Sequence, residues 1–174
     1  MARYTDEIPS TAAIGGHPIH PMLIPFPIAF LVGALAADLA YWSTDEFFWA
    51  RVARWLVGAG LVTGALAAVF GLIDFLTRQR IRQFSSAWIH FLGNAVVLVL
   101  SLISLLLRLD DPADAVLPWG LVLSAAVALI LLVTGWLGGE LSYRHKVGVM
   151  PDTPGHAPDD ITPPEGSRVP GRPR

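Results

Sequence analysis

The sequence contains no cysteine and few charged residues. Without cysteine, the chain cannot form disulfides, ligate an iron–sulfur cluster or use a thiol in catalysis. Only 15% of its 174 residues are charged, against about 25% in a typical soluble domain. The formal net charge of −2 provides no basic surface for nucleic acid. Hydrolase signatures are also missing, because no serine lies in a nucleophile elbow and the single H-x-x-H lacks the glutamate of a metalloprotease.

Apolar residues, in contrast, make up 53% of the sequence, and the mean hydropathy is +0.55. They form four long runs, and each run with its flanks reaches the roughly 20 residues that a membrane-spanning helix needs. We therefore predict an all-α fold, a bundle of four transmembrane helices. The runs are Met22–Trp42, Trp55–Ile73, Phe91–Leu107 and Ala115–Gly139.

The domain organisation follows from these runs. We predict an N-terminal segment over residues 1–16, the transmembrane domain over 17–148 and a disordered, proline-rich tail over 149–174. Acidic residues beside Arg3 deprive the N-terminus of the positive region of a signal peptide, so we expect the first run to be retained. No internal repeat is evident in the sequence.

The distribution of basic residues predicts the orientation in the membrane. Arg78, Arg80 and Arg82 lie between the second and third runs, and Arg144 and Lys146 follow the fourth. The positive-inside rule then places both termini in the cytoplasm. Five tryptophans near the predicted helix ends fit the role of interfacial anchors: Trp42, Trp49, Trp55, Trp88 and Trp119.

Prolines mark the start of the first run, "GGHPIHPMLIPFPIAF". Pro18 and Pro21 are tolerable in a first helical turn, whereas Pro25 and Pro27 should kink or break the helix. The remaining residues 28–42 would rise only about 22 Å, which is too short to cross a bilayer. We therefore expect residues 17–27 to cross part of the membrane as kinked or irregular backbone that faces the other helices.

Histidines gather at the predicted cytoplasmic edge of the bundle. His17 and His20 precede the first helix, His90 opens the third, and His145 follows the fourth. At 100° per residue, a polar stripe on the third helix should face the bundle interior; it consists of His90, Asn94, Ser101 and Ser104. If the fourth helix continues to His145, Thr134 and Gly138 share a face with it.

Other polar and small residues have plain structural interpretations. Glu140 lies four residues before Arg144, and Asp74 four before Arg78, so each carboxylate is expected to form an ion pair along its helix or to serve the histidines. Asp38 lies at the opposite edge, where we expect it to pair with Arg51 or Arg54. A track of small residues on the second helix predicts close helix packing or dimerisation: Gly60, Gly64, Ala67, Ala68 and Gly71.

Three motifs together resemble those of an uncharacterised bacterial membrane family, domain of unknown function 2231. They are "GHPIHPMLIPFPIAF" followed by Asp38, "WIHFLGN", and "GWLGGELSYRHKVGV". The resemblance covers roughly residues 15–150 and implies four membrane helices in the bacterial inner membrane, with no established activity. Some members resemble fusions with a Rieske-type ferredoxin domain, which points to electron transfer. The positions carried over are His17, His20, Asp38, His90, Gly138, Gly139, Glu140 and His145.

We hypothesise that the histidine cluster binds a cofactor used in electron transfer. A b-type haem would take His20 and His90 from facing helices, and a transition-metal ion would take His17, His20, His90 and His145. Asp74, Asn94 and Glu140 could orient an imidazole. A homo-oligomer or a redox partner would complete the function.

Two alternatives remain open. The chain could be a scaffolding subunit whose partner packs on the small-residue track, or a small transporter or proton relay. The relay is less favoured because no ionisable group is expected at the bilayer centre.

Overall fold

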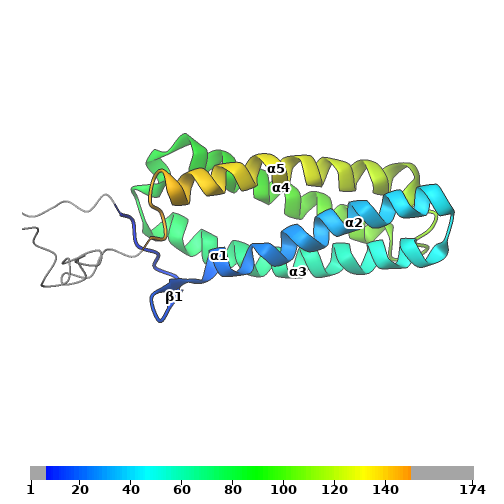
Figure 1. Cartoon of the computed structure of the whole chain (residues 1–174), viewed down its shortest axis with the longest axis horizontal. Coiled ribbons are helices and arrows are strands. Elements are labelled where there is room, and N and C mark those ends of the chain that lie inside the picture. The colour runs from blue at the N-terminus through cyan, green and yellow to red at the C-terminus, as the bar shows by residue number, and fades with distance from the viewer. Residues whose placement is uncertain (1–6, 150–174) are drawn as a thin grey trace, which may run out of the picture.

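The computed structural model describes residues 7–149 and shows a bundle of long helices (Figure 1). Four helical segments are long and apolar enough to cross a membrane, which confirms the predicted fold class. The predicted tail lies outside the described residues, except for Val149. In chain order the elements are β1 (Ala13–Ile14), β2 (His17–Pro18), α1 (Ile19–Leu23), α2 (Pro25–Thr44), α3 (Phe47–Thr77), η1 (Ile81–Gln83), α4 (Ser85–Leu107), η2 (Val116–Gly120) and α5 (Leu121–Tyr143).

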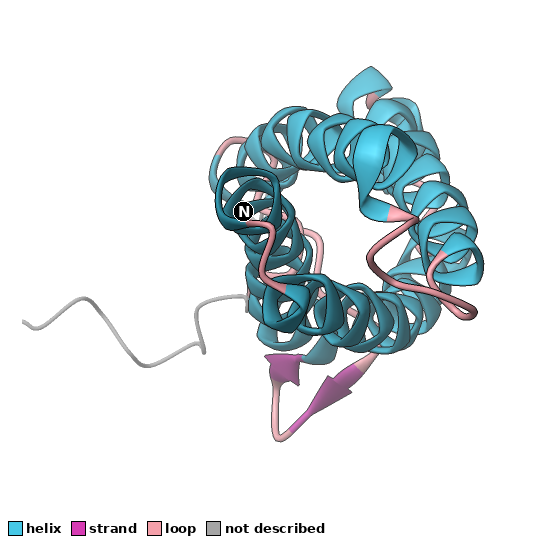
Figure 2. Ribbon diagram, turned by 90° about the vertical axis from the view of Figure 1, so that its right-hand side faces the viewer, coloured by secondary structure: helices cyan, strands magenta, loops and turns pink. Residues whose placement is uncertain are grey.

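The helices form two antiparallel hairpins that pack side by side. In the first, α1 and α2 run against α3, and in the second, α4 runs against α5. The ring closes because α2 also packs on α5 and α3 on α4, as the end-on view shows (Figure 2). Many large apolar side chains point outward, among them Val62, Leu129 and Leu132. Such a surface suits a lipid environment and not water.

The small-residue track of α3 is used inside the chain. A Cβ at Gly60 would lie 2.6 Å from the side chain of Leu31, and one at Gly64 would lie 3.0 Å from that of Leu98. Helices α2 and α4 therefore approach the backbone of α3 closely at the positions where it lacks a side chain. The track therefore serves helix packing within this bundle, which is one of the two roles predicted for it.

The proline-rich entry is more regular than predicted. A two-residue Gly15-Gly16 turn, with φ of 56° and 82°, joins β1 to β2 in a small hairpin. Pro18 precedes α1, Pro21 lies in its first turn, and Pro25 restarts the helix as the first residue of α2. The connecting Ile24 keeps helical dihedral angles. As predicted, the prolines interrupt the helix, which breaks between α1 and α2 at Ile24. The backbone is less irregular than expected, because Ile24 keeps its helical hydrogen bonds to His20 and Ile28.

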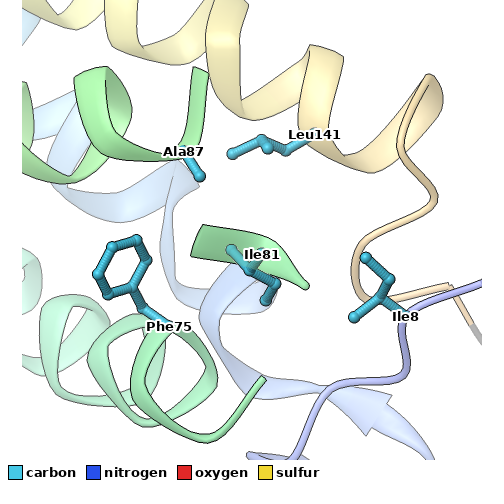
Figure 3. Close-up of a cluster of buried hydrophobic side chains, with 5 residues drawn as sticks. All are labelled: Ile8, Phe75, Ile81, Ala87 and Leu141. Atoms are coloured by element: carbon cyan, nitrogen blue, oxygen red, sulfur yellow. The ribbon is translucent and has the colours of Figure 1, made fainter. Parts of the chain in front are cut away.

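One end of the bundle is closed by the segments that flank it. Ile8 bonds through its backbone to Lys146 and Gly148, so the first and last described residues meet there. Its side chain joins an apolar cluster with residues from α3, η1, α4 and α5 (Figure 3). The members are Ile8, Phe75, Ile81, Ala87 and Leu141. We call this the histidine end of the bundle, because His20, His90 and His145 lie at it.

The two hairpins are structural repeats of one another. Buried positions of α2 recur in α4 and its cap after 70 residues: Pro27, Leu31, Ala34 and Asp38 correspond to Val97, Ser101, Ser104 and Arg108. Buried positions of α3 recur in η2 and α5 after 67 residues: Ala53, Val57, Gly60 and Ala67 correspond to Gly120, Ser124, Val127 and Thr134. In the ring, α2 and α4 each pack on α3 and on α5. With the shared burial, this indicates parallel repeats related by an approximate two-fold axis along the bundle. The sequence conceals this repeat, because few equivalent positions keep the same side chain and most share only their burial.

Candidate functional site

His20 and His90 face each other at the histidine end. Their ring centroids lie 6.2 Å apart, with the ring planes nearly perpendicular at 86°. His20 comes from α1 and His90 from the second turn of α4. They occupy equivalent positions in the two repeats, so the pair lies across the approximate two-fold axis.

Each ring is fixed by the same hydrogen bond. Nδ1 of His20 lies 2.7 Å from the carbonyl oxygen of Ala67, and Nδ1 of His90 lies 2.8 Å from that of Thr134. A carbonyl oxygen can only accept, so each Nδ1 carries a proton and donates it. In the neutral rings the lone pair is then on Nε2, which is the state of a metal-ligating histidine whose other nitrogen is anchored by the protein.

Two glycines make room for the rings. A Cβ at Gly71 would lie 2.8 Å from Cε1 of His20, and one at Gly138 would lie 3.0 Å from Cε1 of His90. Each glycine follows the carbonyl that binds its histidine by one helical turn. On the neighbouring helix, each imidazole is therefore bound by a backbone carbonyl and accommodated by a glycine one turn further along.

The opposite end of the bundle holds a buried ion pair. Asp38 and Arg108 are both 0% exposed. The guanidinium donates from Nη1 and Nη2 to the two carboxylate oxygens at 2.8 and 2.7 Å. Ser124 also donates to Asp38, at 2.6 Å, and Nε of Arg108 donates to Ser104 at 3.2 Å. This network supplies the partners that buried charges require.

This pair corrects the predicted partner of Asp38, which is neither Arg51 nor Arg54. Arg108 directly follows α4, and its side chain lies inside the bundle although it adjoins the acidic link to α5. The repeat would have identified Arg108 as the partner of Asp38, since the two residues occupy equivalent positions in the two hairpins. Like the histidine pair, the ion pair therefore joins the two halves across the axis.

Residues 16–151 match the family model described as "Predicted membrane protein (DUF2231)". The chain belongs to this family. Neither a curated protein nor a solved structure gives a match. Membership confirms the predicted resemblance and makes the chain an integral membrane protein; the family description names no activity.

Within this DUF2231 domain, the other predicted histidines lie away from the pair. His17 is exposed in β2 of the hairpin, and His145 stacks on Phe84 with the ring centroids 4.0 Å apart. Helix α5 ends at Tyr143, so His145 does not continue the face of Thr134 and Gly138 as predicted. Among residues 7–149, no three His, Asp or Glu side chains are placed to hold one metal ion. The expected convergence of four histidines therefore does not occur, because two of them lie outside the helices.

The polar residues expected to orient an imidazole act elsewhere. Asn94 donates to the backbone carbonyl of His90 at 2.8 Å and does not bind its ring. Glu140 pairs with Arg144 at 3.3 Å, which confirms the interpretation as an ion pair along the helix. Asp74 is not paired with Arg78 in the described residues. Its carboxylate instead accepts hydrogen bonds from the Ser10 hydroxyl and from two backbone amides, those of Thr11 and Ala12.

The polar stripe on α4 faces inward, as predicted. Ser101 and Ser104 are 1% and 2% exposed, and Asn94 is half-buried beside α5, where Thr134 approaches its side-chain oxygen at 3.4 Å. The stripe is not continuous through the bundle. An apolar cluster of Leu31, Val97, Val127 and Leu131 occupies the interior between Asn94 and Ser101. The DUF2231 bundle thus has two polar sites on its axis, separated by an apolar layer.

Proposed function

We propose that the His20–His90 pair binds a b-type haem or a transition-metal ion, and that the protein carries electrons in the bacterial inner membrane. The observation that supports this is the paired anchoring of the two imidazoles: both Nδ1 atoms donate to carbonyls, so in the neutral rings both lone pairs are on Nε2. With metal–nitrogen bonds of about 2.0–2.1 Å, two imidazoles on opposite sides of one ion have ring centroids roughly 6 Å apart. The measured separation of 6.2 Å agrees with that value.

The number of ligands favours a centre that needs two protein nitrogens. Haem iron with two axial imidazoles is such a centre, and its filled coordination suits electron transfer better than substrate activation. A transition-metal ion would need further ligands from outside the described residues or from solvent. His17, His145, Asp74 and Glu140 are therefore not part of the site that we propose.

The test is a reduced-minus-oxidised visible spectrum of the purified full-length protein, with elemental analysis of the same sample. Haem produces a Soret band and stoichiometric iron; a metal site produces stoichiometric metal without the band. We expect His20→Ala and His90→Ala each to remove the signal. His17→Ala and His145→Ala are matched controls that should keep it, because neither side chain contacts the pair.

A blank spectrum and no bound metal, after expression with haem and metals supplied, would contradict the proposal. The scaffolding role would then gain support, although Gly60 and Gly64 of the small-residue track already pack against α2 and α4. The relay is disfavoured by the apolar cluster on the axis, since protons need polar groups or water to cross it.

A further inference from the structure

A small cavity lies on the bundle axis beside the Asp38–Arg108 pair. Its volume is about 10 Å³. The repeat divides its wall: the first hairpin contributes three apolar positions, and the second contributes a serine at each equivalent position. These are Leu31, Ala34 and Val57 on one side, and Ser101, Ser104 and Ser124 on the other. Leu123 and Val127 of the second hairpin complete the wall.

The three hydroxyls differ in how they are satisfied. Ser124 donates to Asp38, and Ser104 accepts from Arg108. The hydroxyl of Ser101 is buried and has no hydrogen-bond partner in the described part of the chain. A buried hydroxyl left without a partner destabilises the fold, because it has lost its hydrogen bonds to water. An unpartnered hydroxyl that lines a cavity beside two further hydroxyls indicates a missing ligand.

We propose that this cavity binds one water molecule, held by the hydroxyls of Ser101, Ser104 and Ser124. A cavity needs about 10–15 Å³ and two to four polar partners to hold a water, and this one meets both conditions. Ser101 is free to donate to the water or to accept from it, and Ser124 has oxygen lone pairs left to accept from it. The water thereby extends the hydrogen-bond network of the buried ion pair to Ser101.

The ligand is neutral and small for two reasons. Asp38 and Arg108 compensate each other, and the carboxylate already accepts from the guanidinium and from Ser124. An added ion would therefore lie without a counter-charge in a low-dielectric interior. The volume leaves space for one water and for no larger molecule.

Ser101→Ala tests the proposal through the sign of its effect on stability. If water is bound, the substitution removes one of its partners, and the thermal midpoint of the full-length protein should fall by about 2–4 °C. If the cavity is empty, the substitution removes an unsatisfied hydroxyl, and the midpoint should stay or rise. Ser43→Ala, which removes an exposed hydroxyl bonded to the Ala40 carbonyl, is the matched control.

Solid-state NMR in lipid bilayers provides a second readout that does not depend on stability. We expect polarisation transfer from a bound water to the Ser101 side chain in the wild type. Ser101→Val should fill the cavity and remove the corresponding transfer to Ser124. Absence of transfer in the wild type, or a midpoint that stays or rises in Ser101→Ala, would overturn the proposal.

Discussion

At the scale of single residues, the histidine pair depends on two glycines, whose missing side chains leave space for the imidazole rings. Gly71 and Gly138 lie against the imidazoles of His20 and His90, and an added Cβ would approach each ring to 2.8 and 3.0 Å. The rings can move only by leaving the carbonyls that bind them. From sequence, Gly71 was assigned to helix packing, because a small residue does not reveal which side chain it admits.

We expect Gly71→Ala to displace the His20 ring and to break its bond to Ala67, with Gly138→Ala doing the same to His90. The measurement is ¹⁵N NMR of the imidazoles in bilayers, which reports whether Nδ1 carries a fixed proton. Each substitution should convert one histidine to mixed tautomers and leave the other unchanged.

Gly135→Ala is the control, since a Cβ there meets nothing within 4 Å. It should leave both histidine signals in place. Unchanged histidine signals in Gly71→Ala and Gly138→Ala would show that the rings are not held as described.

At the scale of elements, Asp74 fastens the N-terminal segment to the end of α3. Its carboxylate accepts from the Ser10 hydroxyl at 2.6 Å and from the amides of Thr11 and Ala12 at 2.6 and 3.0 Å. The prediction of a pair with Arg78 followed from spacing along one helix. The partners actually lie more than 60 residues away in sequence, and no helical periodicity reaches that far.

We expect Asp74→Ala to release this segment while the helices stay folded. Amide hydrogen exchange of Thr11 and Ala12 should accelerate by roughly 10- to 100-fold, since hydrogen bonds to a charged group contribute about 1.5–3 kcal/mol. Asp110→Ala is a control at the other end of the bundle and should leave these amides protected. Equal exchange in wild type and Asp74→Ala would refute the role of the carboxylate.

At the scale of the whole molecule, the two hairpins share one helix arrangement and carry opposite charges at one pair of equivalent buried positions. Because Asp38 and Arg108 occupy equivalent positions, the approximate two-fold rotation exchanges the acid with the base. We expect Asp38→Arg or Arg108→Asp alone to abolish folding, because breaking a buried pair costs about 3–5 kcal/mol. The double variant should recover part of the folded yield, measured by size-exclusion chromatography of the detergent-solubilised protein.

Recovery should be partial, because the exchanged charges would lie beside Val57 and Ala34. These positions are equivalent to Ser124 and Ser104 but have no hydroxyl to bond to the charges. Adding Val57→Ser and Ala34→Ser should increase it. A double variant no better than either single variant would contradict the equivalence of the two positions.

Much of the fold was predictable, and the candidate site only in part. Hydropathy alone predicts four spans, since each apolar run matches the thickness of a bilayer, and periodicity predicts that Ser101 and Ser104 face inward. The sequence did not predict Arg108 as the partner of Asp38, because Arg108 lies just beyond an apolar run, where a basic residue is expected to belong to a loop. Which histidines meet depends on where helices end, and His145 lies beyond the last turn of α5.

The ion pair also has a consequence for biosynthesis. Asp38 and Arg108 are separated by 70 positions, so the first hairpin is translated and enters the insertion machinery before the arginine exists. During that interval the carboxylate has no cation from the second hairpin to neutralise it, and lipid is a poor environment for it. Release of the first hairpin into the bilayer is therefore most favourable after the second has arrived. We therefore expect the two hairpins to leave the insertion machinery together and not one after the other.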